Sequence, residues 1–369
     1  MMSRRKFISA AVVAGAGVAV AGYALNARQA RVKYEALAQR TWRHSQGDAG
    51  TRHAQRLEWV RYATLAPSSH NTQCWKFRIG EDAVSILPDF QRRCPVVDPD
   101  DHHLFVSLGC ATENLIQAAA AGGIRGVASF HAGGGGSVEI ALEPAAPMAS
   151  PWFEAIPLRQ STRGEFDGQP ISVQDLKRLE AAGTGHGVSV LLLTERQAMA
   201  RVLDFVIQGN TSQMRNRAFV DELKHWVRFN GAHAARTGDG LFSGSSGNPS
   251  VPIWLGRRLF DLFLTEGAEN DKYARHIRSA AGIAVFVSDR DDKAHWVETG
   301  RAFERFALQA TALGIRHAHL NQPVEVPSLR PEFASFLGVG GRRPDLVVRF
   351  GRGPAMPRSL RRPLETVVL

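Results

Sequence analysis

An internal match constrains the fold of this 369-residue chain more than any other feature. When the sequence is slid along itself, Gly109, Ala111, Glu113, Ala119, Ala121, Gly123, Ile124 and Arg125 fall on Gly300, Ala302, Glu304, Ala310, Ala312, Gly314, Ile315 and Arg316. Two alanine-rich helices do not readily share a glycine, a glutamate and a closing Gly-Ile-Arg in one register by chance. The match therefore predicts an α+β chain with two copies of one unit, packed across a pseudo-two-fold axis as in a dimer fused into one chain.

The first predicted unit covers residues 57–150 and follows a charged helical lead-in at 28–56. The chain length suits about two domains, and 44% hydrophobic residues is ordinary for a globular protein with a sizeable core. Apolar periodicity and turn residues predict strands at 75–79, 84–87, 125–130 and 137–142, and a helix capped by Asp100 or Asp101 that runs to about Ala121.

The second predicted unit covers residues 151–369 and contains an insertion. A Gly/Ser-rich passage followed by an apolar helix, at about 230–264, is expected to form a lid over a site. The other expected elements are a strand at 188–193, a helix from 196 to about 230, a strand at 282–288, a helix at 293–313, and strands at 316–320 and 345–350.

The N-terminus has the pattern of an export signal. Arg4 and Arg5 form a twin-arginine pair, and an uncharged run from Phe7 to Ala27 follows. As a helix this run would measure about 30 Å, enough to cross a bilayer. We therefore expect residues 1–27 to be a twin-arginine signal or a retained anchor, and the protein to be exported to the periplasm or held on the outer face of the cytoplasmic membrane. Because that export machinery carries folded proteins, the signal also favours a cofactor loaded in the cytoplasm.

Charge and cysteine content exclude several function classes. The formal net charge is +10, but the basic residues are scattered rather than gathered into a stripe, so no specific nucleic-acid partner is expected. The three cysteines, Cys74, Cys94 and Cys110, have neither zinc-site nor disulfide-scaffold spacing. The contiguous acidic and histidine residues at 98–103 precede a helix and are interpreted as caps, so no metal is expected.

Three distant stretches together supply what a flavin mononucleotide (FMN) site needs. Hydroxyl and carboxamide groups, which can meet the alternating acceptors and donors on the edge of a flavin ring, are gathered in Ser68, Ser69, Asn71 and Gln73. Guanidinium groups, which can bind two phosphate oxygens at once, are gathered in Arg159 and Arg163, with Ser161 between them, and in Arg361 and Arg362. Because these stretches lie in both halves of the chain, one site can use them only if the halves pack together.

In combination these stretches resemble the nitroreductase family of flavoproteins, whose pattern includes R-x-S-x-R, A-P-S-x-x-N-x-Q-P-W and a late R-x-P-[LIV]-E. The twin-arginine start, the doubled unit and the segments Trp296–Gly300, Leu320–Glu325 and Leu360–Pro363 are similar to the Acg-like branch. The chain departs from the family at Cys74, where proline usually precedes Trp75. There we expect a packed small residue rather than a redox thiol.

The resemblance implies two nitroreductase-like units, each a mixed, mainly antiparallel sheet flanked by helices, with FMN at their junction in a monomer of pseudo-two-fold symmetry. It also implies that the loop around Gln322, Pro323 and Glu325 contacts the flavin. NAD(P)H would deliver hydride, which passes to a nitroaromatic or quinone-type acceptor, and no side chain is named as catalytic.

Two alternatives stay open at this point. One is a non-catalytic FMN-binding protein for storage, sequestration or sensing, in which the lid at 230–264 blocks substrate. The other is an exported anion- or nucleic-acid-binding protein without flavin.

Overall fold

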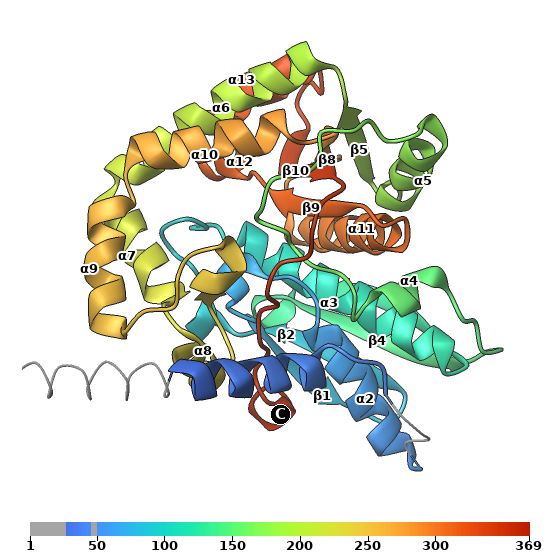
Figure 1. Ribbon diagram of the computed structural model, residues 1–369. Helices are drawn as coiled ribbons and strands as arrows, with labels where there is room; N and C mark the ends of the chain where they lie inside the picture. Colours follow the sequence, from blue (N-terminus) through green and yellow to red (C-terminus); the bar gives the residue numbers. More distant parts are fainter. Residues whose placement is uncertain (1–26, 46–49) are drawn as a thin grey trace, which may run out of the picture.

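The computed structural model describes residues 27–45 and 50–369 and shows an α+β protein with two four-stranded antiparallel sheets (Figure 1). The predicted signal or anchor at residues 1–26 lies outside the described residues. One helix in the described part, α3 (His102–Ala121), is long and apolar enough to span a membrane. However, 83% of its 18-residue window is buried inside the protein, as in a core helix.

The two sheets have the same topology. The first has the strand order β1-β2-β4-β3 and the second β5-β8-β10-β9, with antiparallel pairing throughout. In each unit, the long central helix follows the second strand of the four-stranded sheet along the chain, and the strand after that helix lies at an edge of the sheet. The elements of the first unit are α2 (Arg52–Thr64), β1 (Trp75–Ile79), β2 (Ala83–Pro88), α3 (His102–Ala121), β3 (Ile124–His131) and β4 (Ser137–Pro144).

The second unit contains the same strand order with several additional helices between the strands. Its elements are α4 (Pro151–Ala155), α5 (Val173–Gly183), β5 (Val188–Leu193), α6 (Arg196–Arg215), α7 (Arg217–Trp226), β6 (Val227–Arg228), α8 (Gly231–Thr237), β7 (Leu241–Phe242), α9 (Ile253–Phe263), α10 (Glu266–Arg278), β8 (Gly282–Ser288), α11 (Lys293–Ala312), β9 (Arg316–His319), α12 (Gln322–Glu325), α13 (Arg330–Phe336) and β10 (Arg343–Gly351). The predicted strands of both units are confirmed to within two residues at each end.

The central helices α3 and α11 cross at two glycines that match in the sequence. A Cβ atom on Gly109 would lie 2.0 Å from the carbonyl oxygen of Val297, and one on Gly300 would lie 1.9 Å from that of Val106. Each glycine thus rests on the other helix at the equivalent carbonyl. Only residues without a Cβ allow this approach, which explains why glycine occupies both positions.

The two sheets differ in how they are covered. Strand β8 is buried along its whole length, with Ile283, Val285 and Val287 packed toward α6 while Ala284 and Phe286 pack toward α11. Strand β3 alternates between half-buried and exposed residues, as expected when a sheet has one face in solvent. The second sheet is therefore the more enclosed one.

Two predicted helical segments differ from the structure. The helix expected from 196 to about 230 divides into α6 and α7 because Asn216 leaves helical geometry, and its side chain accepts the backbone N–H of Ala218 as an N-cap. Within 230–264, the segment expected to be a loop forms the short helix α8, strand β7 and a 3₁₀ turn before α9 begins. Strand β7 pairs in parallel with β6, which lies just before this segment. Helix α10 was not expected.

The C-terminal arm returns to the first unit. Beyond β10 the chain runs back to β1, where the backbone N–H of Phe77 donates to Val367 and that of Leu369 donates to Phe77. The helix formed by residues 27–41 packs across the arm and α8, with Tyr34 against Phe242 and Leu360. Residues assigned by sequence to the second unit and to the lead-in therefore complete the first unit.

Candidate cofactor site between the two units

A cavity of about 700 Å³ lies between the two units. Its volume falls in the range of about 300–1,000 Å³ that is typical of small-molecule and cofactor sites. Nine of the predicted site residues line it, namely Ser68, Ser69, Asn71, Arg159, Ser161, Arg163, Gln322, Glu325 and Arg361. The structure places the other three, Gln73, Pro323 and Arg362, outside the cavity lining.

The loop between α2 and β1 is held in an unusual conformation. His70, Asn71 and Gln73 have φ values of 49°, 54° and 54°, in the left-handed region that non-glycine residues rarely adopt. Ser68 Oγ accepts the backbone N–H of Gln73 at 2.9 Å, and Asn71 Nδ2 donates to the carbonyl oxygen of Gly240 at 3.1 Å. The amide of Asn71 thus holds the loop against the insertion.

Gln73 and Arg362 connect the C-terminal arm to this loop. The backbone N–H of Arg362 donates to Gln73 Oε1 at 2.8 Å, and Gln73 Nε2 donates to the carbonyl oxygen of Gly238 at 2.9 Å. The Arg362 guanidinium donates to the carbonyl oxygens of Gln73 and Thr366. Both residues therefore support the wall from behind.

Three of the arginines in the lining have protein partners, and one of them, Arg358, donates to the carbonyl oxygens of Arg159 and Leu158. Arg159, which is 2% exposed, lies 3.2 Å from Glu304, and burial raises the pKa of that carboxyl to about 7. Arg361 donates to the carbonyl oxygens of Leu65 and Ala66 and to Asn71 Oδ1. Burial, with repulsion from Arg159, lowers the pKa of Arg361 to about 9. Positive charge is thus crowded here with one buried carboxylate beside it.

Arg163 differs from its neighbours. Its half-buried guanidinium lines the cavity and forms no hydrogen bond or ion pair with any residue that the structure describes. Burial lowers its pKa. A desolvated cation without a counter-charge is costly in a folded protein, so its position favours an anionic ligand.

Sequence reasoning missed Trp42 and Arg358, which also line the cavity. The guanidiniums of Arg361, Arg358 and Arg159 lie 4.6, 4.8 and 5.9 Å from the Trp42 ring centroid. The indole N–H of Trp42 donates to the carbonyl oxygen of Ser359 at 2.7 Å. Arg358 lies in the basic C-terminal stretch that could have indicated it, whereas Trp42 lies in a charged segment with no motif around it.

Uncharged polar groups line another part of the cavity. Gln322 Oε1 and His319 Nδ1 are buried and have no hydrogen-bond partner among the described residues. Burial, with repulsion from Arg163, lowers the pKa of His319 to about 3, so its ring is neutral. Because buried polar atoms in native proteins are nearly always paired, these two are suited to a bound ligand.

Glu325 is held beside them by Gln213, whose Nε2 donates to its carboxyl at 2.6 Å. Burial raises the pKa of Glu325 to about 7. Near neutral pH this carboxyl is therefore protonated in part of the molecules.

The insertion supplies an apolar wall. Cavity-lining residues from 230–264 include Leu241, Phe242, Leu259, Phe260 and Phe263. Cys74 is 1% exposed and lies outside the lining, and burial raises the pKa of its thiol to about 11. This is the setting of a packed small residue.

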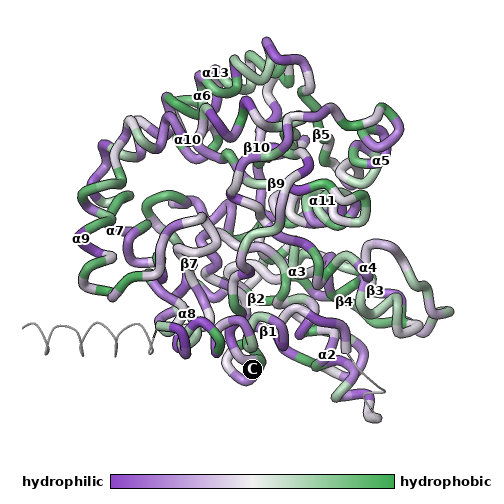
Figure 2. Tube along the Cα trace, viewed as in Figure 1, coloured by the Kyte–Doolittle hydropathy of each residue, from purple (hydrophilic) through white to green (hydrophobic). Residues whose placement is uncertain are grey.

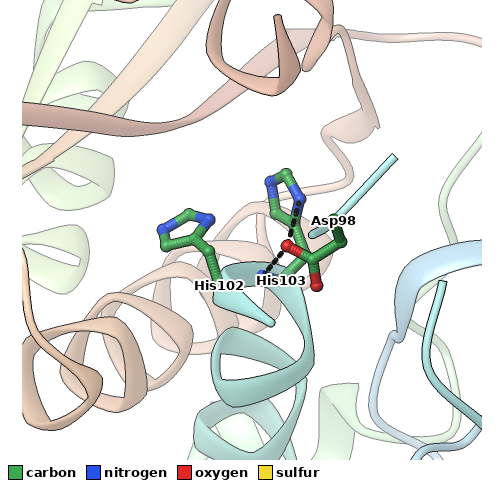
Figure 3. A group of neighbouring side chains, drawn as sticks. All are labelled: Asp98, His102 and His103. Carbon is green, nitrogen blue, oxygen red and sulfur yellow. Dashed lines mark hydrogen bonds and ion pairs between the residues drawn. The ribbon is translucent and has the colours of Figure 1, made fainter. Parts of the chain in front are cut away.

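Asp98, His102 and His103 are grouped closely enough to suggest a metal site, with one possible ligand atom each within 4.8 Å of the others. In Figure 3 dashed lines join Asp98 to His103, and none joins either residue to His102. The Asp98 carboxylate accepts the backbone N–H groups of His103 and Leu104 at 3.0 Å, and His102 Nε2 contacts Asp345. Asp98 therefore caps α3 through its carboxylate, whereas Asp101, one of the two predicted caps, occupies the N-cap position without a side-chain hydrogen bond to the helix.

No family model matches the chain. Two curated proteins named "Putative NAD(P)H nitroreductase", from Mycobacterium tuberculosis strains CDC 1551 and H37Rv, are each 26% identical over 318 residues, covering 83% of this chain and 88% of theirs. The similarity thus extends over most of both chains.

Solved structures resemble the chain only at a low level. The nitroreductase with bound FMN from Bacteroides fragilis has a TM-score of 0.33 and 16% identity and covers 56% of this chain and 90% of its own. The FMN-dependent nitroreductase NfnB from Mycobacterium smegmatis, in complex with NADPH, has a TM-score of 0.37 and 15% identity and covers 58% of this chain and 94% of its own.

Proposed function

We propose that the protein is an FMN-binding, nitroreductase-like oxidoreductase that takes hydride from NAD(P)H and passes two electrons to a nitroaromatic or quinone-type acceptor. One observation carries the proposal: nine of the predicted flavin residues, drawn from both units, line one cavity, in a chain whose relatives are named as putative NAD(P)H nitroreductases. The Acg-like branch and the duplication of one ancestral unit belong to the same proposal.

The residues present fit FMN. Arg163, a guanidinium without a hydrogen-bond or ion-pair partner among the described residues, suits the phosphate, and Arg358 adds positive charge to the lining of the same cavity. The unpaired Gln322 Oε1 and His319 Nδ1 suit polar edges of the ligand. The hydroxyl of Ser69 also lines the cavity and is suited to the ribityl chain or ring.

When bound, FMN supplies the capacity to accept and release a hydride at one ring nitrogen. The protein's part is to bind, orient and exclude water. The arginine-rich wall favours an anionic ligand, and the apolar wall that includes Phe242 and Phe260 limits water. Glu325 holds a proton in part of the molecules near neutral pH and stays hydrogen-bonded to Gln213.

Anaerobic reduction of the FMN-loaded protein tests this function. Bleaching of the flavin absorbance by NADPH or NADH, followed by reoxidation with a quinone or nitroarene, is the expected result. Bleaching by dithionite but by neither nicotinamide would refute turnover and favour the non-catalytic FMN-binding alternative. A preparation that neither retains nor rebinds FMN would refute both.

The non-catalytic alternative has one specific observation in its favour. The insertion is hydrogen-bonded to the loop that carries the serines, because Gly240 N–H donates to the carbonyl of Asn71 while Gly238 accepts from Gln73. The double variant Phe260→Ala, Phe263→Ala removes two rings from the apolar wall that the insertion supplies to the cavity. If the wall blocks the nicotinamide, this variant should gain NADPH reduction that the wild type lacks.

Export and oligomeric state complete the proposal. We propose twin-arginine export to the periplasm or to the outer face of the cytoplasmic membrane, and a monomer with pseudo-two-fold symmetry. Replacing Arg4 and Arg5 by lysine should leave the protein in the cytoplasmic fraction. Light scattering should give the mass of one chain, and a stable dimer would contradict the fused-dimer interpretation.

A further inference from the structure

Helix α9 exposes apolar side chains that no described residue covers. Trp254, Leu262 and Phe263 are 66%, 66% and 65% exposed, the largest exposures among aromatic or leucine side chains in the described chain. Trp254, Arg258 and Leu262 follow one another at four-residue intervals and therefore share one face. Figure 2 shows hydrophobic and hydrophilic stretches side by side along α9, at the outer left edge of the molecule.

The same helix carries uncompensated positive charge. Arg257 and Arg258 are exposed, and neither forms an ion pair with a residue that the structure describes. The single acidic residue of α9, Asp261, is neutralised by Lys224, whose Nζ lies 2.5 Å from its carboxylate. Apolar residues flanked by free arginines, with tryptophan among them, are typical of helices that lie in the interfacial layer of a membrane.

The opposite face of α9 is fixed to the protein. Gly256 lies directly on the ring of Phe229, where a Cβ atom would come within 2.6 Å of the ring, and Leu259 and Phe260 line the cavity. Phe263 both lines the cavity and is exposed, so it forms part of the rim where the cavity meets solvent. Phe263 follows Leu262 directly but lies about 100° further around the helix, so the rim borders the exposed face at the end of α9.

The start of the described chain lies next to the same insertion. The carbonyl oxygen of Ala30 and the side chain of Tyr34 lie against Gly231, the first residue of α8, which precedes α9. Figure 1 shows that the helix formed by residues 27–41 begins beneath α8, on the side of the molecule where α9 lies. In the sequence, the uncharged run from Phe7 to Ala27 ends at this point.

We propose that α9 docks on an anionic lipid surface, with Trp254 and Leu262 among the lipids, Phe263 at the edge of the contact, and Arg257 and Arg258 at the headgroups. The occupant of this face is thus the membrane surface. The rim of the cavity at Phe263 then faces the membrane, so that an apolar molecule can pass between lipid and cavity without crossing water. This inference does not depend on the flavin.

An environment-sensitive dye on α9 of the full-length chain tests the proposal. Cys74, Cys94 and Cys110 are all buried, so a thiol introduced as Leu262→Cys can be labelled selectively. The matched control is Val173→Cys, because Val173 is also apolar and 70% exposed but begins α5, on the opposite side of the molecule (Figure 1). Phosphatidylcholine vesicles with and without phosphatidylglycerol are the probe.

With anionic vesicles, the dye at residue 262 should shift its emission to the blue, and the dye at residue 173 should not. Combining Arg257→Gln and Arg258→Gln should raise the lipid concentration needed for the shift by about ten- to a hundredfold. Brominated lipids should also quench wild-type tryptophan fluorescence more than that of Trp254→Phe, which serves as a second measurement in unlabelled protein.

Three results would overturn the proposal. The dye at residue 262 could stay in water while the chain sediments with vesicles, which would assign binding to the N-terminal segment alone. It could respond no more than the dye at residue 173. The emission of the dye at residue 262 could also shift in the absence of lipid as the protein concentration rises, which would assign the exposed face of α9 to contact with a second copy of the chain.

Discussion

Arg163→Met should weaken FMN binding without destabilising the protein. In the apo protein this guanidinium has no hydrogen-bond or ion-pair partner among the described residues, so its removal leaves no carboxylate unpaired. In the complex we expect it to donate to the phosphate, and a hydrogen bond to a charged group contributes about 1.5–3 kcal/mol. The dissociation constant should therefore rise about 10- to 150-fold, because 1.4 kcal/mol corresponds to a factor of ten.

Titrating apo protein with FMN, while following quenching of flavin fluorescence, measures this constant. Thermal unfolding of the apo form gives the stability alongside. For Arg163→Met we expect an unchanged or slightly higher melting temperature, because burial already disfavours the charge and lowers the pKa of Arg163.

Two other arginine variants serve as controls. Arg362→Met removes a guanidinium that lies outside the lining and donates to backbone carbonyls, so it should leave FMN affinity within about twofold of the wild type. Arg159→Met leaves Glu304 buried without its partner and should cost about 3 kcal/mol of stability. The reasoning is refuted if Arg163→Met binds FMN as tightly as the wild type, or if Arg362→Met weakens binding as much as Arg163→Met does.

Three further predictions follow from packing, burial and capping. Gly300→Ala should cost at least about 3 kcal/mol in chemical unfolding, because its Cβ would lie 1.9 Å from the carbonyl of Val106. Gly267→Ala in α10 is the control, because a Cβ there has open space around it, and it should leave the free energy of unfolding unchanged. If both substitutions lowered stability equally, the close crossing of α3 and α11 would be contradicted. Burial raises the Glu304 pKa from an ordinary 4.5 to about 7, so the folded state holds the extra proton between these values and stability falls as pH rises through them. Between pH values below 4.5 and above 7, the unfolding free energy of the wild type should fall by about 3 kcal/mol more than that of Glu304→Gln. Plots of unfolding free energy against pH that run parallel for the two proteins would contradict this. Asp98→Ala should cost about 1–2 kcal/mol as a lost cap, whereas zinc or a chelator should leave the wild-type melting temperature unchanged; a shift with either would indicate a metal.

Local sequence patterns were sufficient for the strands and the central helices. The apolar run at 282–288 becomes β8, fully buried on both faces, and the run at 188–193 becomes β5 with the predicted bounds. The match between the two central helices predicted that they pack against each other, and the structure adds that they cross at the matching Gly109 and Gly300. These features depend on near neighbours or on a repeated constraint, and both leave a trace in the sequence.

The parts that sequence reasoning missed depend on where distant segments return. Trp42 enters the cavity wall only because the C-terminal arm brings Arg358 and Arg361 over its ring. Asn71 was predicted to face a ring edge, yet its amide donates to Gly240 in the insertion, a contact with no local signal. Motif residues thus pointed to residues that share one cavity, while the long-range path of the chain decides which of their atoms are free of protein partners.

Matching residues of the two units also show why this fold is suited to one site. Glu113 and Glu304 occupy equivalent positions on α3 and α11, but Glu113 contacts Arg301 and Arg305 of the facing helix, whereas Glu304 faces Arg159 from the cavity lining. In a dimer of identical subunits every substitution appears twice and both sites change together. In a single chain the two equivalent positions can change separately. One carboxylate can then be neutralised within the helix pair while the other supports an arginine-rich wall, and the Gly109–Gly300 crossing is retained.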